Sequence, residues 1–268
     1  MDFTNQVRRL ARAHQIGAEL SADIQAWVDS NPSDVRACIA EDRLSWELRL
    51  QVFRPPRLEQ WGFHFGEAVH HLRATLDNLI VSIARQSGVT DEKQLRALVF
   101  PICGTRKEWK DRQKGTACLP EWCRVALEQM QPIQRLKHGG TLDEDLLLAL
   151  RDIDNSTKHH LQVEPTLTSQ SIHHAPSVTF ETEEGAAASV PPDTEVVVAP
   201  FEEGAVLFRH RVSGRIKSVS GQYNATAQVQ VVLPDECAVG VTELLAALLQ
   251  YTRIVMGHVV SAADKAEA

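Results

Sequence analysis

The sequence predicts an α+β protein with an N-terminal helical bundle, an antiparallel sheet of about five strands and a C-terminal helix returning to the core. Three observations support this. Up to residue 160, apolar side chains recur at the spacing of amphipathic helices. Between residues 161 and 234 they alternate along short runs, as in half-buried antiparallel strands. From residue 235 the helical spacing returns, so we divide the chain into 1–160, 161–234 and 235–268.

The composition is typical of a globular protein that works in the cytoplasm. The chain has 268 residues, of which 43% are hydrophobic and 24% charged, and its net charge of −7 argues against a general nucleic-acid coat. A local basic groove remains compatible with that charge. We find no apolar run long enough to span a membrane and no signal-peptide pattern. The five cysteines are irregularly spaced, which favours reduced thiols over a disulfide framework.

Four helices are expected before residue 160. They cover residues 3 to about 28, about 59 to 86, the stretch framed by Pro120 and Pro132, and the stretch that Thr141 can cap. The first carries Arg8, Arg9 and Arg12, which we interpret as a solvated basic face. Residues 34–53 are mixed in character, and within them Trp46, Leu48, Leu50 and Val52 alternate like a short strand. "VFPIC" is a buried extended segment, and residues 105–120 are expected to be a surface loop.

The five strands of the sheet are expected in the period-2 runs "LQVEPTLT", "SVTFET", "TEVVVAP", "AVLFRHRV" and "TAQVQVVL". "EEGAAASVPPDT" is expected to be a loop between two of them. The final helix is "VGVTELLAALLQYTRIVMGHVV".

The stretch "GEAVHHLRATLDNLI", residues 66–80, is unusually rich in ionisable groups for a helix with a good apolar face. At 100° per residue, one broad arc forms the core face. That arc consists of Phe65, Val69, Leu72, Leu76, Leu79, Ile80 and Ile83. His70, Arg73 and Asp77 fall together beside the arc, and Glu67 lies one turn before His70. Partly buried charged groups need partners, so this row is the candidate site.

A second helix, "RDIDNSTKHH", carries groups that can meet this row. Asp154 and Lys158 border its apolar stripe at i, i+4, and Asn155 and His159 lie one step further round. If the two stripes share a core, the two polar rows face each other. We therefore expect Asp154, Asn155 and Lys158, together with Glu67, to bind a ligand.

Three interpretations of this cluster stay open. A fully paired network can simply fix the register of the two helices. Glu67-x-x-His70 is half of the paired motif of di-metal bundles, but no second copy follows, so we predict no metal and no cofactor. The third interpretation is ligand binding or catalysis.

The motifs resemble those of a widespread bacterial family without an assigned activity. Its members carry a pattern like "GEVLHNLRSALDHLV", then "FPI", then a helix ending in "QP", then "N-x-D-K-H-R". The matching text here is "GEAVHHLRATLDNLI", "FPIC", "QPI" and "NSTKHH", in the same order. The resemblance covers residues 58 to 262.

That family in turn resembles, more loosely, the HEPN helical bundles, which often act as metal-independent ribonucleases in toxin and phage-defence systems. The resemblance implies RNA or a nucleotide as partner and a site that works across a homodimer. Arg73 stands where the HEPN arginine should bind phosphate, but Asn78 occupies the region of the expected histidine. His70 or His159 would have to replace that histidine, with Asp77 beside Arg73, or nuclease activity is lost. The alternative is a non-enzymatic binding or structural module whose polar cluster only fixes helix packing.

Overall fold

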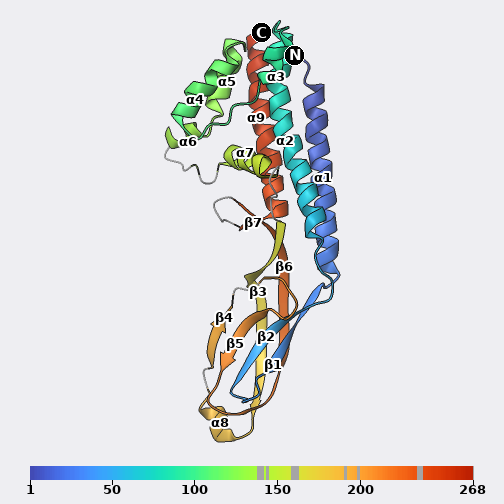
Figure 1. Ribbon diagram of the computed structural model, residues 1–268, viewed down its shortest axis with the longest axis vertical. Coiled ribbons are helices and arrows are strands. Elements are labelled where there is room, and N and C mark those ends of the chain that lie inside the picture. The colour runs from blue at the N-terminus through green and yellow to red at the C-terminus, as the bar shows by residue number, and fades with distance from the viewer. Residues whose placement is uncertain are drawn as a thin grey trace. The chain divides into compact units, whose positions relative to one another are not determined.

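The computed structural model describes residues 1–137, 142, 145–157, 163–189, 192–197, 200–233 and 238–267. The fold is α+β, as predicted, with helices in the N-terminal part, antiparallel strands and a long C-terminal helix (Figure 1). The helices are α1 (Thr4–Asp29), α2 (Leu58–Gln86), α3 (Glu92–Ala97), α4 (Arg106–Gln113), α5 (Glu121–Gln129), α6 (Ile133–Lys137), α7 (Leu146–Thr157), α8 (Glu183–Ala187) and α9 (Val241–Glu267), with a short 3-10 turn, η1 (Lys114–Thr116). The strands are β1 (Ser33–Ile39), β2 (Ser45–Val52), β3 (Val163–Phe180), β4 (Asp193–Val196), β5 (Val206–Arg211), β6 (Ile216–Val232) and β7 (Ala238–Gly240).

The chain divides into two compact units, and each is made of segments distant in sequence. The helical unit contains Met1–Ser21, Glu59–Val163 and Val231–Ala268. The sheet unit contains Ala22–Leu58 and Glu164–Gln230. The stretch around residues 34–53, expected within the 1–160 bundle, therefore supplies strands β1 and β2 to the sheet unit.

Three long helices, α1, α2 and α9, run side by side in the helical unit (Figure 1). The predicted core face of α2 is confirmed, because all seven residues of that arc are fully buried. The pairing of Gln6 with Asn78 and Ser82, and of Asp2 with Gln86, shows that α1 runs antiparallel to α2. The short helices α5 and α7 pack against α9.

By length and composition α9 could cross a membrane, since its most apolar window has a mean hydropathy of 1.3. Core helices of globular proteins meet the same criterion, and 39% of that window is buried. The absence of a membrane span therefore stays a prediction.

Between residues 161 and 234 the described strands are β3 to β6, because the runs "LQVEPTLT" and "SVTFET" both lie largely within the one long strand β3, and β1 and β2 add two further strands to the sheet unit. One sheet has the order β1-β2-β5-β4 and the other β3-β6-β7, within the described residues. Trp46 pairs with His210 and Leu48 with Phe208 across β2 and β5, and the register shifts after Leu48. The alternation of Trp46, Leu48 and Leu50 places all three in the core of this unit, as their period of two predicts.

Two predicted loops are wrong in part. The polar stretch 105–120 contains helix α4 and the turn η1, and the "EEGAAASVPPDT" stretch contains the short helix α8. Helix α4 buries only Trp109, so it lacks the apolar periodicity that reveals most helices. A capping box between Thr105 and Glu108 starts it, and this motif was the available sequence signal.

Candidate functional site

Arg73 and Asp77 are bound to each other and to the backbone of Phe100. Nη2 of Arg73 lies 2.9 Å from Oδ1 of Asp77 and also donates to the carbonyl oxygen of Phe100 at 2.8 Å. The Phe100 amide donates back to Oδ1 of Asp77 at 2.8 Å. The Arg73 side chain is only 13% exposed. Its guanidinium is therefore engaged in holding the extended "VFPIC" segment against α2.

Burial also affects the charge states of this pair. Removal from water raises the pKa of the Asp77 carboxyl, and the Arg73 guanidinium and the Phe100 amide oppose that rise. The other terminal nitrogen of Arg73, Nη1, is buried and has no hydrogen-bond partner among the described residues. An arginine stays protonated in such an environment, so the pair is a partly buried ion pair in which the two N–H groups of Nη1 have no partner among the described residues.

His70 pairs with Asp154 across α2 and α7. Nδ1 of His70 lies 3.1 Å from Oδ1 of Asp154, whose side chain is 9% exposed, whereas the His70 side chain is 65% exposed. A carboxylate only accepts hydrogen bonds, so it favours the imidazole tautomer with its proton on Nδ1. The other ring nitrogen, Nε2, is then an acceptor on an exposed ring.

Glu67 does not join His70. Its Oε1 atom lies 3.4 Å from Nη2 of Arg12 on α1 and 3.8 Å from Nε2 of His71. Glu67 thus faces α1 while His70 faces α7, so the two do not converge on one ion. Among the described residues, no group of three or more His, Cys, Asp or Glu side chains could hold a metal.

The remaining predicted residues divide into two groups. Asn155 is exposed on α7, one position beyond Asp154. Lys158 and His159 lie outside the described residues, and so does Thr141. The cap of α7 is instead Asp145, whose Oδ1 accepts hydrogen bonds from the amides of Leu147 and Leu148.

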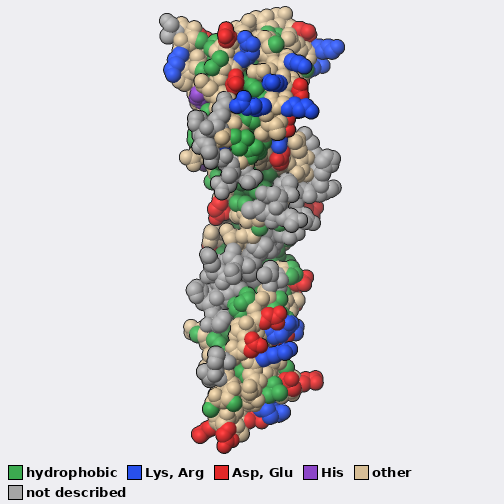
Figure 2. Space-filling model, turned by 90° about the vertical axis from the view of Figure 1, so that its left-hand side faces the viewer, with side chains coloured by type: hydrophobic (Ala, Val, Ile, Leu, Met, Phe, Trp, Pro, Cys, Tyr) green, Lys and Arg blue, Asp and Glu red, His purple; other side chains and the backbone are tan. Residues whose placement is uncertain are grey.

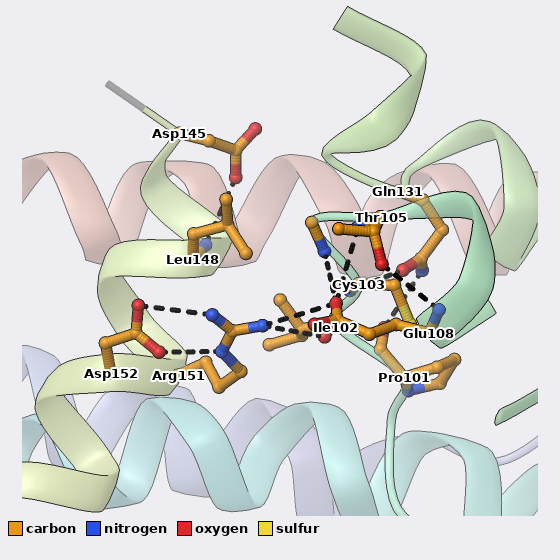
Figure 3. Close-up of polar contacts among 11 residues, drawn as sticks. Pro101, Ile102, Cys103, Thr105, Glu108, Gln131, Asp145, Leu148, Arg151 and Asp152 are labelled. Atoms are coloured by element: carbon orange, nitrogen blue, oxygen red, sulfur yellow. Dashed lines mark hydrogen bonds and ion pairs between the residues drawn. The ribbon is translucent and has the colours of Figure 1, made fainter. Parts of the chain in front are cut away.

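Gln131 and Arg151 were not predicted, yet they hold the same extended segment (Figure 3). Gln131 is buried, donates to the carbonyls of Pro101 and Leu127, and accepts from the amide of Cys103 at 3.0 Å. Arg151 donates to the carbonyl of Ile102 at 3.3 Å and is paired through two nitrogens with Asp152. The quoted motif segments "GEAVHHLRATLDNLI", "FPIC" and "QPI" therefore meet in space, and Gln131 in "QPI" was the available signal.

Helix α4 adds a basic surface to the helical unit. Its exposed basic side chains, with one just beyond it, are Arg106, Lys107, Lys110, Arg112 and Lys114. Figure 2 shows Lys and Arg side chains gathered over the helical part of the face that carries α4 and α5. An acidic chain thus has a locally basic surface, which raises the local concentration of anionic ligands.

The arrangement offers an exposed, oriented imidazole on the same helix as a partly buried ion pair. Comparisons of the chain with protein-family models, with curated proteins and with solved structures found no match of any of the three kinds.

Proposed function

We propose that the helical unit acts on RNA or a nucleotide, with His70 as the acid-base group and Asp154 as the residue that orients it. The observation that carries this proposal is the 3.1 Å contact between the exposed His70 ring and the buried Asp154 carboxylate. An imidazole held by a carboxylate through Nδ1 presents Nε2 as a proton acceptor. The basic surface of α4 supports an anionic ligand.

The chemistry this pair can perform is metal-independent cleavage of an RNA chain. Nε2 of His70 takes the proton of a ribose 2′-hydroxyl, and the freed oxygen attacks the adjacent phosphorus. The bond from phosphorus to the 5′-oxygen of the next nucleotide breaks, leaving a 2′,3′-cyclic phosphate. The departing oxygen takes a proton from water or from the imidazolium. In this scheme Asp154 holds the tautomer and the orientation of His70.

Arg73 has a different role in this proposal from the one the HEPN resemblance implies. Its Nη2 atom is already bound to Asp77 and Phe100, and its side chain is mostly buried. We assign it as a positioning residue that fixes α2 to the extended segment. Asn78 donates to the carbonyl of Ala74 in its own helix, and an amide transfers no proton, so it is no substitute for a histidine.

A second candidate is a non-enzymatic module whose polar cluster only fixes helix packing. The ring of bonds among Arg73, Asp77 and Phe100 favours it, because every bond in that ring is internal. The two candidates differ in what they require of His70. Catalysis needs its exposed ring, whereas a packing role does not depend on Nε2.

RNA cleavage by purified protein in the presence of a chelator separates the two. We compare the full chain with His70→Asn, Asp154→Asn and, as a matched control, His14→Asn at an exposed position of α1. The His70 variant should lose about 100- to 10,000-fold in rate, the usual contribution of an acid-base group, with an unchanged melting temperature. The control should cleave like the wild type. Wild-type protein that leaves RNA intact, or a His70 variant that cleaves at full rate, refutes the catalytic proposal.

A further inference from the structure

A groove of about 530 Å³ lies between α1 and α2 in the helical unit. It is lined by Asn5, Gln6, Arg8, Arg9, Arg12, His71, Asn78, Val81, Ser82 and Arg85. Four of these residues are arginines, three from α1 and one from α2. The volume falls in the range of small-molecule sites, which is about 300–1,000 Å³.

The positive charge of this groove is only partly balanced. Arg12 is paired with Glu67 at 3.4 Å, and Arg85 with Glu92 at 3.2 Å. In the described part of the chain, neither Arg8 nor Arg9 lies within ion-pairing distance of a carboxylate. The guanidinium groups of Arg8 and Arg9 are therefore not engaged in an ion pair there, and the Asp2 carboxylate interacts with Arg8 only at longer range.

The walls of the groove are fixed relative to each other. The Gln6 side chain is 1% exposed, and its Nε2 atom donates to the carbonyl of Asn78 at 2.8 Å and to Oγ of Ser82 at 2.7 Å. This buried link, made by residues that line the groove, holds α1 against α2. His71 forms part of the α2 wall, and its Nδ1 atom is buried without a hydrogen-bond partner among the described residues. The arginines of the groove thus stand on two helices that are held at a fixed spacing.

We propose that this groove binds phosphate oxyanions, supplied by an RNA backbone or by a free polyphosphate. The guanidinium fork matches the oxygens of a phosphate and binds them through two parallel hydrogen bonds. Among the described residues that line the groove there is no Phe, Tyr or Trp ring on which a base could stack, so the groove would bind the phosphates and not distinguish base sequence. His71 lines the groove and follows His70 in the sequence, but His70 faces α7 and lies about 100° further round α2. The identity of RNA as ligand rests on the proposed function above.

The test measures binding of a fluorescein-labelled single-stranded oligouridylate by fluorescence anisotropy over a range of salt concentrations. The protein carries His70→Asn throughout, so that the RNA stays intact. In this background Arg8→Gln with Arg9→Gln removes the two unpaired charges. Arg96→Gln with Arg124→Gln removes the same charge from exposed positions of α3 and α5. Circular dichroism establishes that both double variants are folded.

We expect the Arg8/Arg9 variant to bind at least about tenfold more weakly, and the Arg96/Arg124 variant to bind like its parent. The dependence of log affinity on log salt should become shallower by about 0.7 for each phosphate that the variant no longer neutralises. The proposal that the groove binds phosphate is refuted if the Arg8/Arg9 variant binds as tightly as its parent. It is also refuted if both double variants are weakened equally.

Inorganic tripolyphosphate distinguishes the two sources of phosphate. If an RNA backbone is the ligand, the oligouridylate binds more tightly than tripolyphosphate, and affinity grows with RNA length. If a free polyphosphate is the ligand, tripolyphosphate binds at least as tightly and displaces the RNA completely. Failure of both probes to bind the parent protein refutes the proposal.

These outcomes are separable from the cleavage experiment. If the protein binds RNA through Arg8 and Arg9 but leaves it intact, the phosphate-binding groove is supported and the catalytic role of His70 is refuted. If the protein cleaves RNA through His70 but the Arg8/Arg9 variant binds RNA as tightly as its parent, the catalytic role of His70 is supported and the phosphate-binding groove is refuted.

Discussion

Arg73 and Asp77 lie one turn apart on α2 and together bind both backbone groups of Phe100, the carbonyl through Nη2 and the amide through Oδ1. The pair thus caps an extended segment that has no strand partner in the described structure. Removal of the Arg73–Asp77 pair should therefore lower the stability of the protein, whichever function the protein has.

Arg73→Ala should lower the free energy of unfolding by up to about 3–5 kcal/mol, because it leaves the partly buried Asp77 carboxylate without its cation. Urea unfolding followed by circular dichroism measures this. Arg96→Ala, at an exposed position of α3, is the control and should stay within about 0.5 kcal/mol of the wild type. Similar unfolding midpoints for the two variants would show that the ion pair contributes little.

Gln131→Leu should destabilise the helical unit by about 1–3 kcal/mol for each buried group left unsatisfied. The variant removes the acceptor of the Cys103 amide and the donor to the Pro101 carbonyl. Hydrogen exchange gives a local measurement, since the Cys103 amide should lose its protection. In Gln94→Leu, at an exposed position of α3, that amide should remain protected. Unchanged protection in the Gln131 variant contradicts the assignment.

His71 should make the protein less stable as the pH falls. Burial lowers its pKa below the ordinary value of 6.5, and Arg9, Arg12 and His70 add to this, while Glu67 opposes it. The unfolded chain therefore binds more protons, so this contribution is complete above pH 6.5 and is lost as the pH falls toward the folded pKa.

In His71→Gln, the free energy of unfolding should consequently fall less steeply than in the wild type between neutral pH and about pH 5. Urea titrations at a series of pH values give the two slopes. His14→Gln, at an exposed position of α1, serves as the comparison and should keep the wild-type slope. A steeper slope in the His71 variant would reverse the sign of this argument.

Two glycines should respond to alanine in opposite directions. Gly257 lies within α9, and a methyl group there would meet nothing within 4 Å, so Gly257→Ala should stabilise by about 0.5–1 kcal/mol. A methyl group on Gly214 would collide with the backbone of Gly185, so Gly214→Ala should destabilise the sheet unit. Thermal unfolding of both variants checks this, and shifts of equal sign would contradict it.

The predictable part of this structure is the part that side-chain periodicity determines. The core face of α2 and the inward alternation of Trp46, Leu48 and Leu50 follow from the spacing of apolar residues alone. The start of α1 and the end of α2 lie within one or two residues of the predicted bounds. Helix α4 was missed because a helix with a single buried residue has no periodicity to detect.

The polar contacts were harder to predict for a different reason. The sequence placed Arg73 and Asp77 opposite a second polar helix, and Asp154 of α7 does interact electrostatically with both. Their hydrogen bonds, however, go to the backbone of Phe100. Backbone groups of an extended segment need partners wherever no strand supplies them, and periodicity does not say which side chains will do so. The approach of Arg85 to Arg8 and Arg9 likewise depends on the antiparallel packing of α1 on α2, which neither helix reveals alone.

The division of the helical unit into three separate stretches of chain has a consequence for its synthesis. Every residue of the sheet unit precedes residue 231, whereas the helical unit needs α9, which is synthesised after the whole sheet unit. As the chain leaves the ribosome, the sheet unit can close while α1 and α2 still expose the surface that α9 will cover. During that interval the apolar faces of these helices are open to aggregation or to a chaperone, and release of the C-terminal helix ends it.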